Sequence, residues 1–328
     1  MKNNRKLIAI VGPTASGKTA IGVKLAKEFN GEIVSADSRQ VFRGLDLGTG
    51  KDLHEYGGVK YHLIDVKNPG EKFTLFDYLS LARKAIEDIF SRGKIPIVVG
   101  GTGLYIQGLV EGFELENNNH RRANIEYKFL REELNNKAVE ELQDILKEIN
   151  SKAYDNLADK QNPHRLIRAI EKAQAGEIVT QVKPDFEALQ IGLEWPREEL
   201  NKRIDKRVDD RFQAGMLEEV EGLLKSGVDP EWLLKLGLEY KFITQFLLDC
   251  HSEAKSRRIS EILRSAQDDK KSAQDINIRK AFKEAKDLLK LRSHQYAKRQ
   301  MTWFKRFLEI VWAVDYKDIE TLVEKYLN

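Results

Sequence analysis

The chain has 328 residues, of which 41% are hydrophobic and 33% are charged, so it is long enough to bury a core beneath a well-solvated surface. Its formal net charge of +3 is too small to indicate a nucleic-acid partner by itself, and its single cysteine, Cys250, excludes an internal disulfide framework and a thiolate zinc cluster. The apolar run after the polar start is too short for a signal peptide, and nothing approaches a membrane span, so we expect a cytoplasmic protein with no membrane partner.

Short apolar runs alternate with helical patterns at the start of the chain. The run at residues 7–11 is continuous and apolar, which is typical of a buried parallel strand, and residues 32–36 and 95–99 are predicted to form further buried strands. Apolar residues recur at helical spacing over residues 19–29 and 76–90. Because strands that alternate with helices form parallel sheets, the sequence predicts a three-layer α/β fold.

Three parts of the chain differ in pattern. Residues 1–114 are predicted to form the first part of the α/β core. Residues 115–180 are helical in pattern, polar and poor in strand formers, so we interpret them as a helical insertion domain. Residues 181–328 are predicted to complete the core and to add a helical C-terminal region.

The third part contains several predicted elements. An apolar run at residues 190–193 resumes the sheet, one long amphipathic helix covers residues 197–224, and residues 309–314 return to the sheet. Residues 251–275 are charged, poor in large apolar residues and contain the sequence Ser-Ala-Gln-Asp twice. This composition predicts an exposed low-complexity spacer that is partly helical.

Basic residues are concentrated near the C-terminal end. Residues 279–306 contain ten lysines and arginines against only Glu284 and Asp287. Such a block is either an electrostatic footprint for a polyanion or an ordinary solvated helix face, and charge alone does not separate the two.

A phosphate-binding motif follows the first predicted strand. It has the pattern G-x-x-x-x-G-K-[ST] between a strand and a helix, which is the context that this motif requires. Its glycines let backbone N–H groups turn toward a phosphate, Lys18 supplies a positive charge, and the Thr19 hydroxyl is a ligand for Mg²⁺. The motif alone leaves open whether the ligand is a nucleotide or another pyrophosphate. It consists of Gly12, Pro13, Thr14, Ala15, Ser16, Gly17, Lys18 and Thr19.

An ordered set of further motifs separates the possible ligands. The set contains Asp37-Ser38-Arg39-Gln40, Gly48-Thr49-Gly50-Lys51, Gly100-Gly101-Thr102-Gly103-Leu104-Tyr105, Pro163-His164-Arg165-Leu166-Ile167-Arg168, Arg203 with Arg207, and Ala297-Lys298-Arg299-Gln300-Met301-Thr302-Trp303. Along nearly its whole length the chain resembles the tRNA dimethylallyltransferases, also called tRNA isopentenyltransferases. The resemblance implies a P-loop NTPase-like three-layer parallel sheet and a monomer that binds one RNA.

The resemblance implies a prenyl transfer to an adenine next to the anticodon, and the residue types suit that reaction. The exocyclic amine of adenine is a poor nucleophile because its lone pair is delocalised, so a carboxylate that accepts its proton assists it. Asp37 follows a strand beside the phosphate loop and matches the catalytic aspartate of the family. Lys18 and Thr102 are the other catalytic residues that the resemblance implies. Asp37 has a simpler alternative interpretation as a helix N-cap.

The same resemblance implies that the loop holds dimethylallyl pyrophosphate rather than ATP. Backbone N–H groups, Lys18 and Mg²⁺ at Thr19 then stabilise the charge on the departing pyrophosphate. Arg203 and Arg207 lie one helical turn apart and are predicted to face this leaving group; ordinary solvated arginines are the alternative.

Contacts with the tRNA anticodon loop are also implied. The family pattern assigns Asp37, Ser38, Arg39 and Gln40 to the target adenine and its surroundings, and Thr102 to the channel. It assigns His164, Arg165, Leu166, Ile167 and Arg168, together with Arg122 or its neighbour Arg121, to the RNA. Lys298, Arg299 and Trp303 fit the C-terminal motif, although Trp303 is equally typical of a core aromatic residue.

The sequence departs from the family pattern at three places. Phe42 stands where tyrosine is usual, Gly237–Lys241 replaces the commoner Ile-Gly-Tyr-Lys-Glu, and the spacer at 251–275 interrupts the path to the last helices. Because none of these changes affects the phosphate loop or Asp37, we expect activity to be retained.

Two other functions remain possible from the residues alone. A small-molecule kinase of the shikimate or nucleoside type shares the loop and the sheet, but Gly100-Gly101-Thr102 follows the third strand where an acidic residue is expected. A non-catalytic RNA-binding protein is the second alternative, and the intact Lys18 and Asp37 argue against it.

Overall fold

A computed structural model describes residues 5–114, 125–157, 159–175, 180–251, 273–307 and 309–328. The chain divides into two compact units, of which the first contains Met1–Val110 and Pro184–Asn328 and the second Glu111–Lys183. The predicted insertion at 115–180 falls within the second unit. In the described parts of the chain, no helix combines the length and hydrophobicity that crossing a bilayer requires.

A parallel sheet forms the centre of the first unit. Its six strands run in the order β3-β2-β4-β1-β7-β8, so that β1 and β4 occupy the middle. The strands are β1 (Lys6–Val11), β2 (Gly31–Ser35), β3 (Tyr61–His62), β4 (Ile95–Gly100), β7 (Glu187–Leu193) and β8 (Ile310–Ala313). In register, Ile10 lies between Val99 of β4 and Ile191 of β7. The predicted α/β fold with a parallel sheet is confirmed, including the return of the chain at β8.

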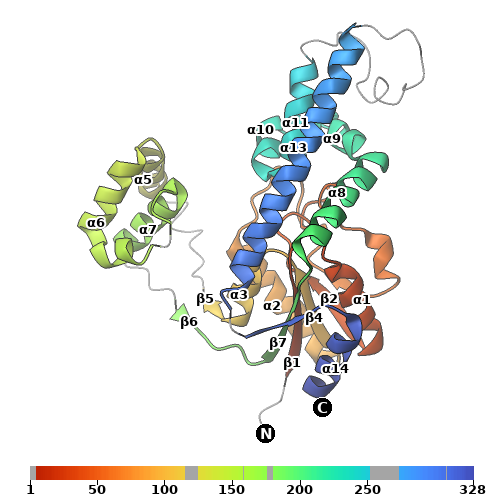
Figure 1. Cartoon of the computed structure of the whole chain (residues 1–328). Coiled ribbons are helices and arrows are strands. Elements are labelled where there is room, and N and C mark those ends of the chain that lie inside the picture. Colours follow the sequence, from red (N-terminus) through yellow and green to blue (C-terminus); the bar gives the residue numbers. More distant parts are fainter. Residues whose placement is uncertain (1–4, 115–124, 158, 176–179, 252–272, 308) are drawn as a thin grey trace. The chain divides into compact units, whose positions relative to one another are not determined.

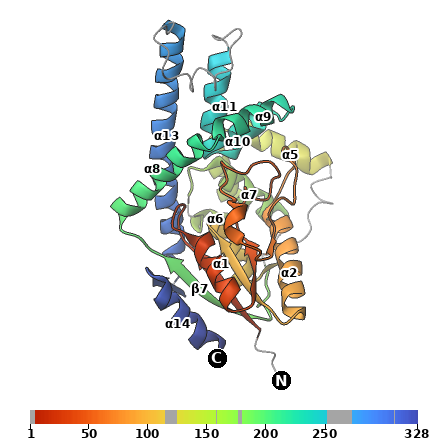
Figure 2. The same ribbon diagram turned by 90° about the vertical axis from the view of Figure 1, so that its right-hand side faces the viewer.

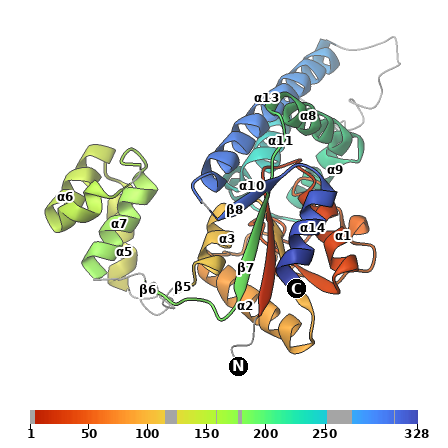
Figure 3. The same cartoon turned by 60° about the horizontal axis from the view of Figure 1, so that its bottom comes forward.

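Helices cover both faces of the sheet (Figure 3). On one face lie α1 (Lys18–Glu28) and α14 (Tyr316–Leu327), which share a buried apolar cluster with the strands. On the other face lies α2 (Leu75–Ser91), with α3 (Gly103–Val110) beside it. The Thr74 side chain caps the start of α2 by accepting the backbone N–H of Asp77, which fixes where that helix begins. The result is the three-layer arrangement that the sequence predicts.

Five further helices gather beyond one end of the sheet (Figures 1 and 2). They are α8 (Arg197–Gln213), α9 (Met216–Lys225), α10 (Pro230–Leu236), α11 (Leu238–His251) and α13 (Ala273–Phe304). Their apolar faces meet in one core, which also takes in Phe42 from the segment after β2. Phe42 is 5% exposed and packs edge-on against Trp232 at 5.0 Å, so a ring without a hydroxyl suits this apolar site.

The prediction of one long helix over residues 197–224 is wrong. The helix ends at Gln213, and α9 starts at Met216 after Gly215, whose φ of 105° lies outside the helical region. A residue with positive φ leaves the right-handed helical path and so ends the helix, and glycine is favoured there because an L side chain would be strained. Of the predicted spacer at 251–275, residues 252–272 lie outside the described part of the chain, and α13 begins at Ala273.

The second unit is mainly helical, in line with the pattern of its sequence. It contains α5 (Ile125–Asn135), α6 (Val139–Asp155) and α7 (Pro163–Ala175), with a small core that includes Leu146 and Ile170. A two-residue antiparallel pair, β5 (Phe113–Glu114) with β6 (Thr180–Gln181), belongs to this unit and was not predicted.

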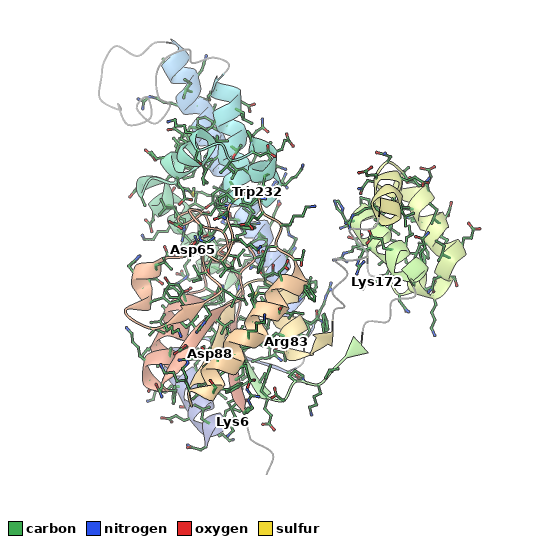
Figure 4. The ribbon with its side chains drawn as sticks, turned by 180° about the vertical axis from the view of Figure 1, so that it is seen from behind. Lys6, Asp65, Arg83, Asp88, Lys172 and Trp232 are labelled. Carbon is green, nitrogen blue, oxygen red and sulfur yellow. The ribbon has the colours of Figure 1, made fainter. Side chains whose placement is uncertain are left out.

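A charged cluster marks the amino ends of the strands in the first unit. Figure 4 shows Asp88 toward the end where Lys6 begins β1, and Asp65 toward the other end. Glu32 is 1% exposed and accepts bonds from Arg92, Lys94 and His62, and Arg92 holds the pKa of Glu32 well below its usual range. Glu32, His62 and Asp88 have the spacing of a metal site, but Arg92 and Lys94 already neutralise the buried Glu32 carboxylate, which makes the cluster an ion-pair network.

Two helical glycines give opposite stability predictions. A Cβ on Gly22 of α1 would stand 2.5 Å from Cγ2 of Val99, whereas Gly222 of α9 has no heavy atom within 4 Å of that position. We therefore expect Gly22→Ala to lower the free energy of unfolding by about 1–3 kcal/mol, because overpacking strains the core. Gly222→Ala, the matched control, is expected to raise it by about 0.5–1 kcal/mol. Urea denaturation of both variants checks this, and equal effects would contradict the packing of α1 on β4.

Candidate active site

The phosphate motif forms a turn between β1 and α1. Gly12 and Gly17 adopt φ of 148° and 88°, and a Cβ on Gly12 would lie 3.1 Å from the backbone oxygen of Leu193 in β7. Glycine is therefore required here both for conformation and for close approach. The turn leads directly into the N-terminus of α1, where free N–H groups and the helix dipole attract an anion.

Two arginines of α8 reach this turn. Arg203 donates from Nε to the backbone oxygen of Ala15 at 3.0 Å and lies over the Trp195 ring at 4.2 Å. Arg207 donates from Nη1 to the Thr14 hydroxyl at 3.3 Å. The structure thus brings to the phosphate loop two side chains that stand about 190 residues away in the sequence. Neither is an ordinary solvated arginine.

Lys18 is half-buried and lies among other charged groups. Its Nζ donates to the backbone oxygen of Pro13 at 2.6 Å. Burial lowers the pKa of Lys18 to about 7, and the positive charge of Arg207 adds to this effect while Asp37 opposes it. A lysine with a pKa near 7 is only partly protonated at neutral pH, and a bound anion stabilises its protonated form. The site is therefore suited to binding a phosphate.

This pKa predicts that anion binding takes up a proton. Below pH 7 Lys18 is already charged, whereas above pH 7 it must first gain a proton that the bound anion then stabilises. We expect uptake of about one proton on binding pyrophosphate at pH 8 and much less at pH 6. Calorimetry in buffers of different ionisation enthalpy measures this number. The Lys18→Met variant is the control, because any proton uptake that it shows comes from the ligand and not from Lys18. Equal proton uptake by the wild-type protein and this variant would contradict the prediction.

Asp37 occupies a turn directly after β2. Its Oδ1 accepts the backbone N–H groups of Arg39 at 2.8 Å and Gln40 at 3.4 Å. The residues that follow form turns rather than a helix, so the interpretation of Asp37 as a helix N-cap is wrong. Because both turn bonds use Oδ1, the second carboxylate oxygen is not required to hold the turn.

The loop after β4 holds the Asp37 turn through hydrogen bonds of Thr102. The Thr102 hydroxyl accepts the backbone N–H of Ser38 at 3.1 Å, and the Thr102 N–H donates to Ala36 at the same distance. Gln300 of α13 connects two loops, because its Oε1 accepts the Thr14 N–H at 2.8 Å and its Nε2 donates to Gly101 at 2.9 Å. The last long helix is thereby fixed to the phosphate loop.

One pocket at the carboxyl edge of the sheet unites these parts. Among the predicted residues it brings together Thr14, Lys18, Thr19, Asp37, Ser38, Arg39, Gln40 and Arg207. Sequence reasoning missed other lining residues, namely Gly48, Thr49, Gly50, Tyr56, Val99, Leu238, Glu239, Tyr296 and Gln300. Gly48, Gly50 and Gln300 stand in the quoted motifs, which is the signal that could have identified them as lining residues.

Other predicted residues lie elsewhere. The side chains of Leu166 and Ile167 are 0% and 2% exposed in the core of the second unit, which corrects their assignment as RNA contacts. They hold α7 in place, while His164 and Arg165 of the same helix are exposed and Arg168 pairs with Glu171. Arg122 lies outside the described residues.

The C-terminal motif divides between surface and interior. Lys298 and Arg299 are exposed, and Gln300 is 7% exposed. Trp303 packs against Gly103 at the start of α3, where a Cβ would clash with the indole ring. Trp303 therefore acts as a packing residue between α13 and α3, which agrees with the core interpretation.

The fold and the pocket together define a P-loop α/β protein in which the Asp37 carboxylate and Lys18 of the P-loop motif line one pocket. The family model described as IPP transferase matches residues 40–307, and the model described as isopentenyl transferase matches residues 5–59. The chain belongs to the IPP transferase family.

Individual relatives match over nearly their full length. A protein named tRNA dimethylallyltransferase 2 from Treponema denticola is 42% identical over 328 residues, which cover 96% of this chain and 97% of the relative. A protein of the same name from Shewanella sediminis is 40% identical over 92% of this chain and 90% of its own. Among solved structures, the tRNA isopentenylpyrophosphate transferase from Bacillus halodurans matches with a TM-score of 0.66 and 34% identity, covering 98% of this chain and 97% of that one.

Proposed function

We propose that this protein transfers the dimethylallyl group of dimethylallyl pyrophosphate to N6 of the adenosine that follows the anticodon in tRNA, releasing pyrophosphate. Membership of the IPP transferase family and the names of its relatives support this function. The observation that carries the chemistry is the pocket that holds Lys18, Arg207 and Asp37 together. A pyrophosphate site and a proton acceptor within one pocket are what a prenyl transfer to an amine requires.

The donor half of the reaction falls to the phosphate loop. The allylic carbon–oxygen bond breaks as pyrophosphate departs with growing negative charge, and the loop N–H groups, Lys18 and Arg207 stabilise that charge. The Thr19 hydroxyl lines the same pocket and is the residue that would hold Mg²⁺. When bound there, Mg²⁺ supplies further positive charge to the leaving phosphates.

The acceptor half falls to Asp37. As the new bond forms between N6 and the allylic carbon, the amine becomes positively charged and loses a proton to the carboxylate. Arg39 and Gln40 follow in the same turn, so the side chains that we assign to the adenine and its surroundings come from one short segment. Thr102 acts by holding the Ser38 backbone.

RNA binding uses two surfaces in this proposal. The exposed Lys298 and Arg299 of α13 contact the RNA backbone. In this proposal the basic block near the C-terminal end is therefore a surface for a polyanion. His164 and Arg165 of α7 provide a second contact from the second unit. We place the reaction in the cytoplasm, with one RNA bound to each monomer.

The test is transfer of a labelled dimethylallyl group to unmodified tRNA in the presence of Mg²⁺. We expect label in the RNA and one pyrophosphate released per group transferred, with loss of both when the adenosine after the anticodon is replaced. ATP turnover without label in the RNA would instead support the kinase alternative. tRNA binding with neither reaction would support a non-catalytic RNA-binding protein.

A further inference from the structure

A single carboxylate organises the loop that forms one wall of the pocket. Glu219 of α9 accepts the backbone N–H groups of three successive residues, namely Asp46 at 2.9 Å and Leu47 at 2.6 Å through Oε2, and Gly48 at 3.2 Å through Oε1. Such a set of charge-assisted bonds fixes the path of a segment that has no regular secondary structure. Residues 48–50 of this loop line the pocket.

Tyr240 completes the arrangement. Its hydroxyl donates to Oε1 of Glu219 at 2.7 Å, and its side chain is completely buried. Burial and the nearby carboxylate raise the pKa of Tyr240, which keeps the phenol protonated as a donor. A Cβ on Gly48 would stand 2.6 Å from the Tyr240 ring, so the loop lies directly on that ring.

The loop in turn contacts both halves of the pocket. Gln40, which we assign to the acceptor base, donates from Nε2 to the backbone oxygen of Gly50 at 3.0 Å. On its other side, Gly50 lies so close to the guanidinium group of Arg207 that a Cβ would clash with it. Gly50 thus stands between a side chain for the acceptor and a side chain for the donor.

We propose that Glu219 and Tyr240 are positioning residues, which hold the loop at residues 46–50 so that Gln40 and Arg207 align the acceptor base with the donor. This inference rests on the proposed function. It also gives a role to Tyr240 within the segment Gly237–Lys241, where the sequence departs from the family pattern. Neither residue touches the reacting atoms, and both act through the loop.

The proposal predicts a loss of turnover without an equal loss of binding. In Glu219→Gln, one amide nitrogen replaces an acceptor oxygen and faces N–H or O–H donors, so the loop loosens. Both substrates still bind through the phosphate loop and the Asp37 turn, but their alignment suffers. We expect kcat at saturation to fall at least about tenfold, with each KM changed less than threefold. Tyr240→Phe keeps the ring and removes one donor, so we expect kcat to fall about threefold.

The control is Glu221→Gln on the same helix. Glu221 pairs with Lys225, whereas the loop N–H groups of residues 46–48 donate to Glu219, so replacement of Glu221 is expected to leave kcat within about 1.5-fold of wild type. All rates are measured well below the melting temperature of each variant. Wild-type kcat in Glu219→Gln despite a lowered melting temperature would overturn the proposal. If that variant does not fold, unchanged kcat in Tyr240→Phe overturns it. Absence of transfer by the wild-type protein would refute the proposed function instead.

Discussion

Asp37→Asn is expected to lower the rate of dimethylallyl transfer about 10³-fold while leaving pyrophosphate binding within about twofold of wild type. The amide keeps an oxygen for the N–H groups of Arg39 and Gln40, so the turn after β2 is retained. It has no capacity to accept the proton of N6. The loss therefore measures proton transfer rather than misfolding. Single-turnover transfer with saturating donor and RNA gives the rate, and calorimetry with pyrophosphate gives the affinity.

Asp37→Ala separates the two roles of this residue. It removes the turn bonds as well as the proton acceptor, so we expect a loss at least as large as that of Asp37→Asn. Fluorescence titration with unmodified tRNA establishes whether the RNA still binds to each variant. An Asp37→Asn protein with more than a tenth of wild-type activity would show that another group accepts the proton.

Lys18→Met is expected to lower kcat/KM for the donor about 10²–10³-fold, by analogy with the removal of one preorganised donor from a site of developing charge. Lys18 is half-buried, and desolvation lowers its pKa to about 7, so its charge is disfavoured until the pyrophosphate arrives. Methionine keeps the length of the chain and removes the charge. Because the charge on the phosphates grows as the allylic bond breaks, kcat as well as donor affinity is expected to fall.

Lys24→Met on the same helix is the matched control. Lys24 is on the exposed side of α1, where its Nζ lies 3.3 Å from the centre of the Tyr316 ring. Its loss is expected to leave kcat/KM unchanged. Steady-state rates at varied donor concentration compare the two variants. If both lose activity to the same extent, the effect belongs to the stability of α1 and not to the phosphate site.

Local sequence patterns predicted the parts of the site that lie in short segments. The strands β1, β2 and β4 were predicted at residues 7–11, 32–36 and 95–99, and the phosphate loop and the Asp37 turn follow the first two of them. Parallel strands present their carboxyl ends at one edge of the sheet. The prediction of a parallel sheet therefore implied that these two turns lie close together. The return of residues 309–314 to the sheet was also predicted, whereas its pairing as β8 with β7 was not.

Contacts between distant segments were beyond this reasoning. Gln300 contacts the Thr14 N–H across 286 positions, and Glu219 contacts Leu47 across 172. Such contacts depend on how the helices pack on one another, which periodicity does not specify. A motif also fails to separate buried from exposed members. Leu166 and Ile167 share a motif with His164, but the side of α7 on which they lie places them in the core.

The most direct measurement is a crystal structure of the protein with a non-reactive thio analogue of dimethylallyl pyrophosphate and an anticodon stem-loop RNA. We expect both phosphates on the turn of residues 12–19 beside Lys18, and the N6 amine of the adenosine within hydrogen-bonding distance of Asp37. A diphosphate bound elsewhere, or an adenosine that approaches the pocket without reaching Asp37, would contradict this expectation.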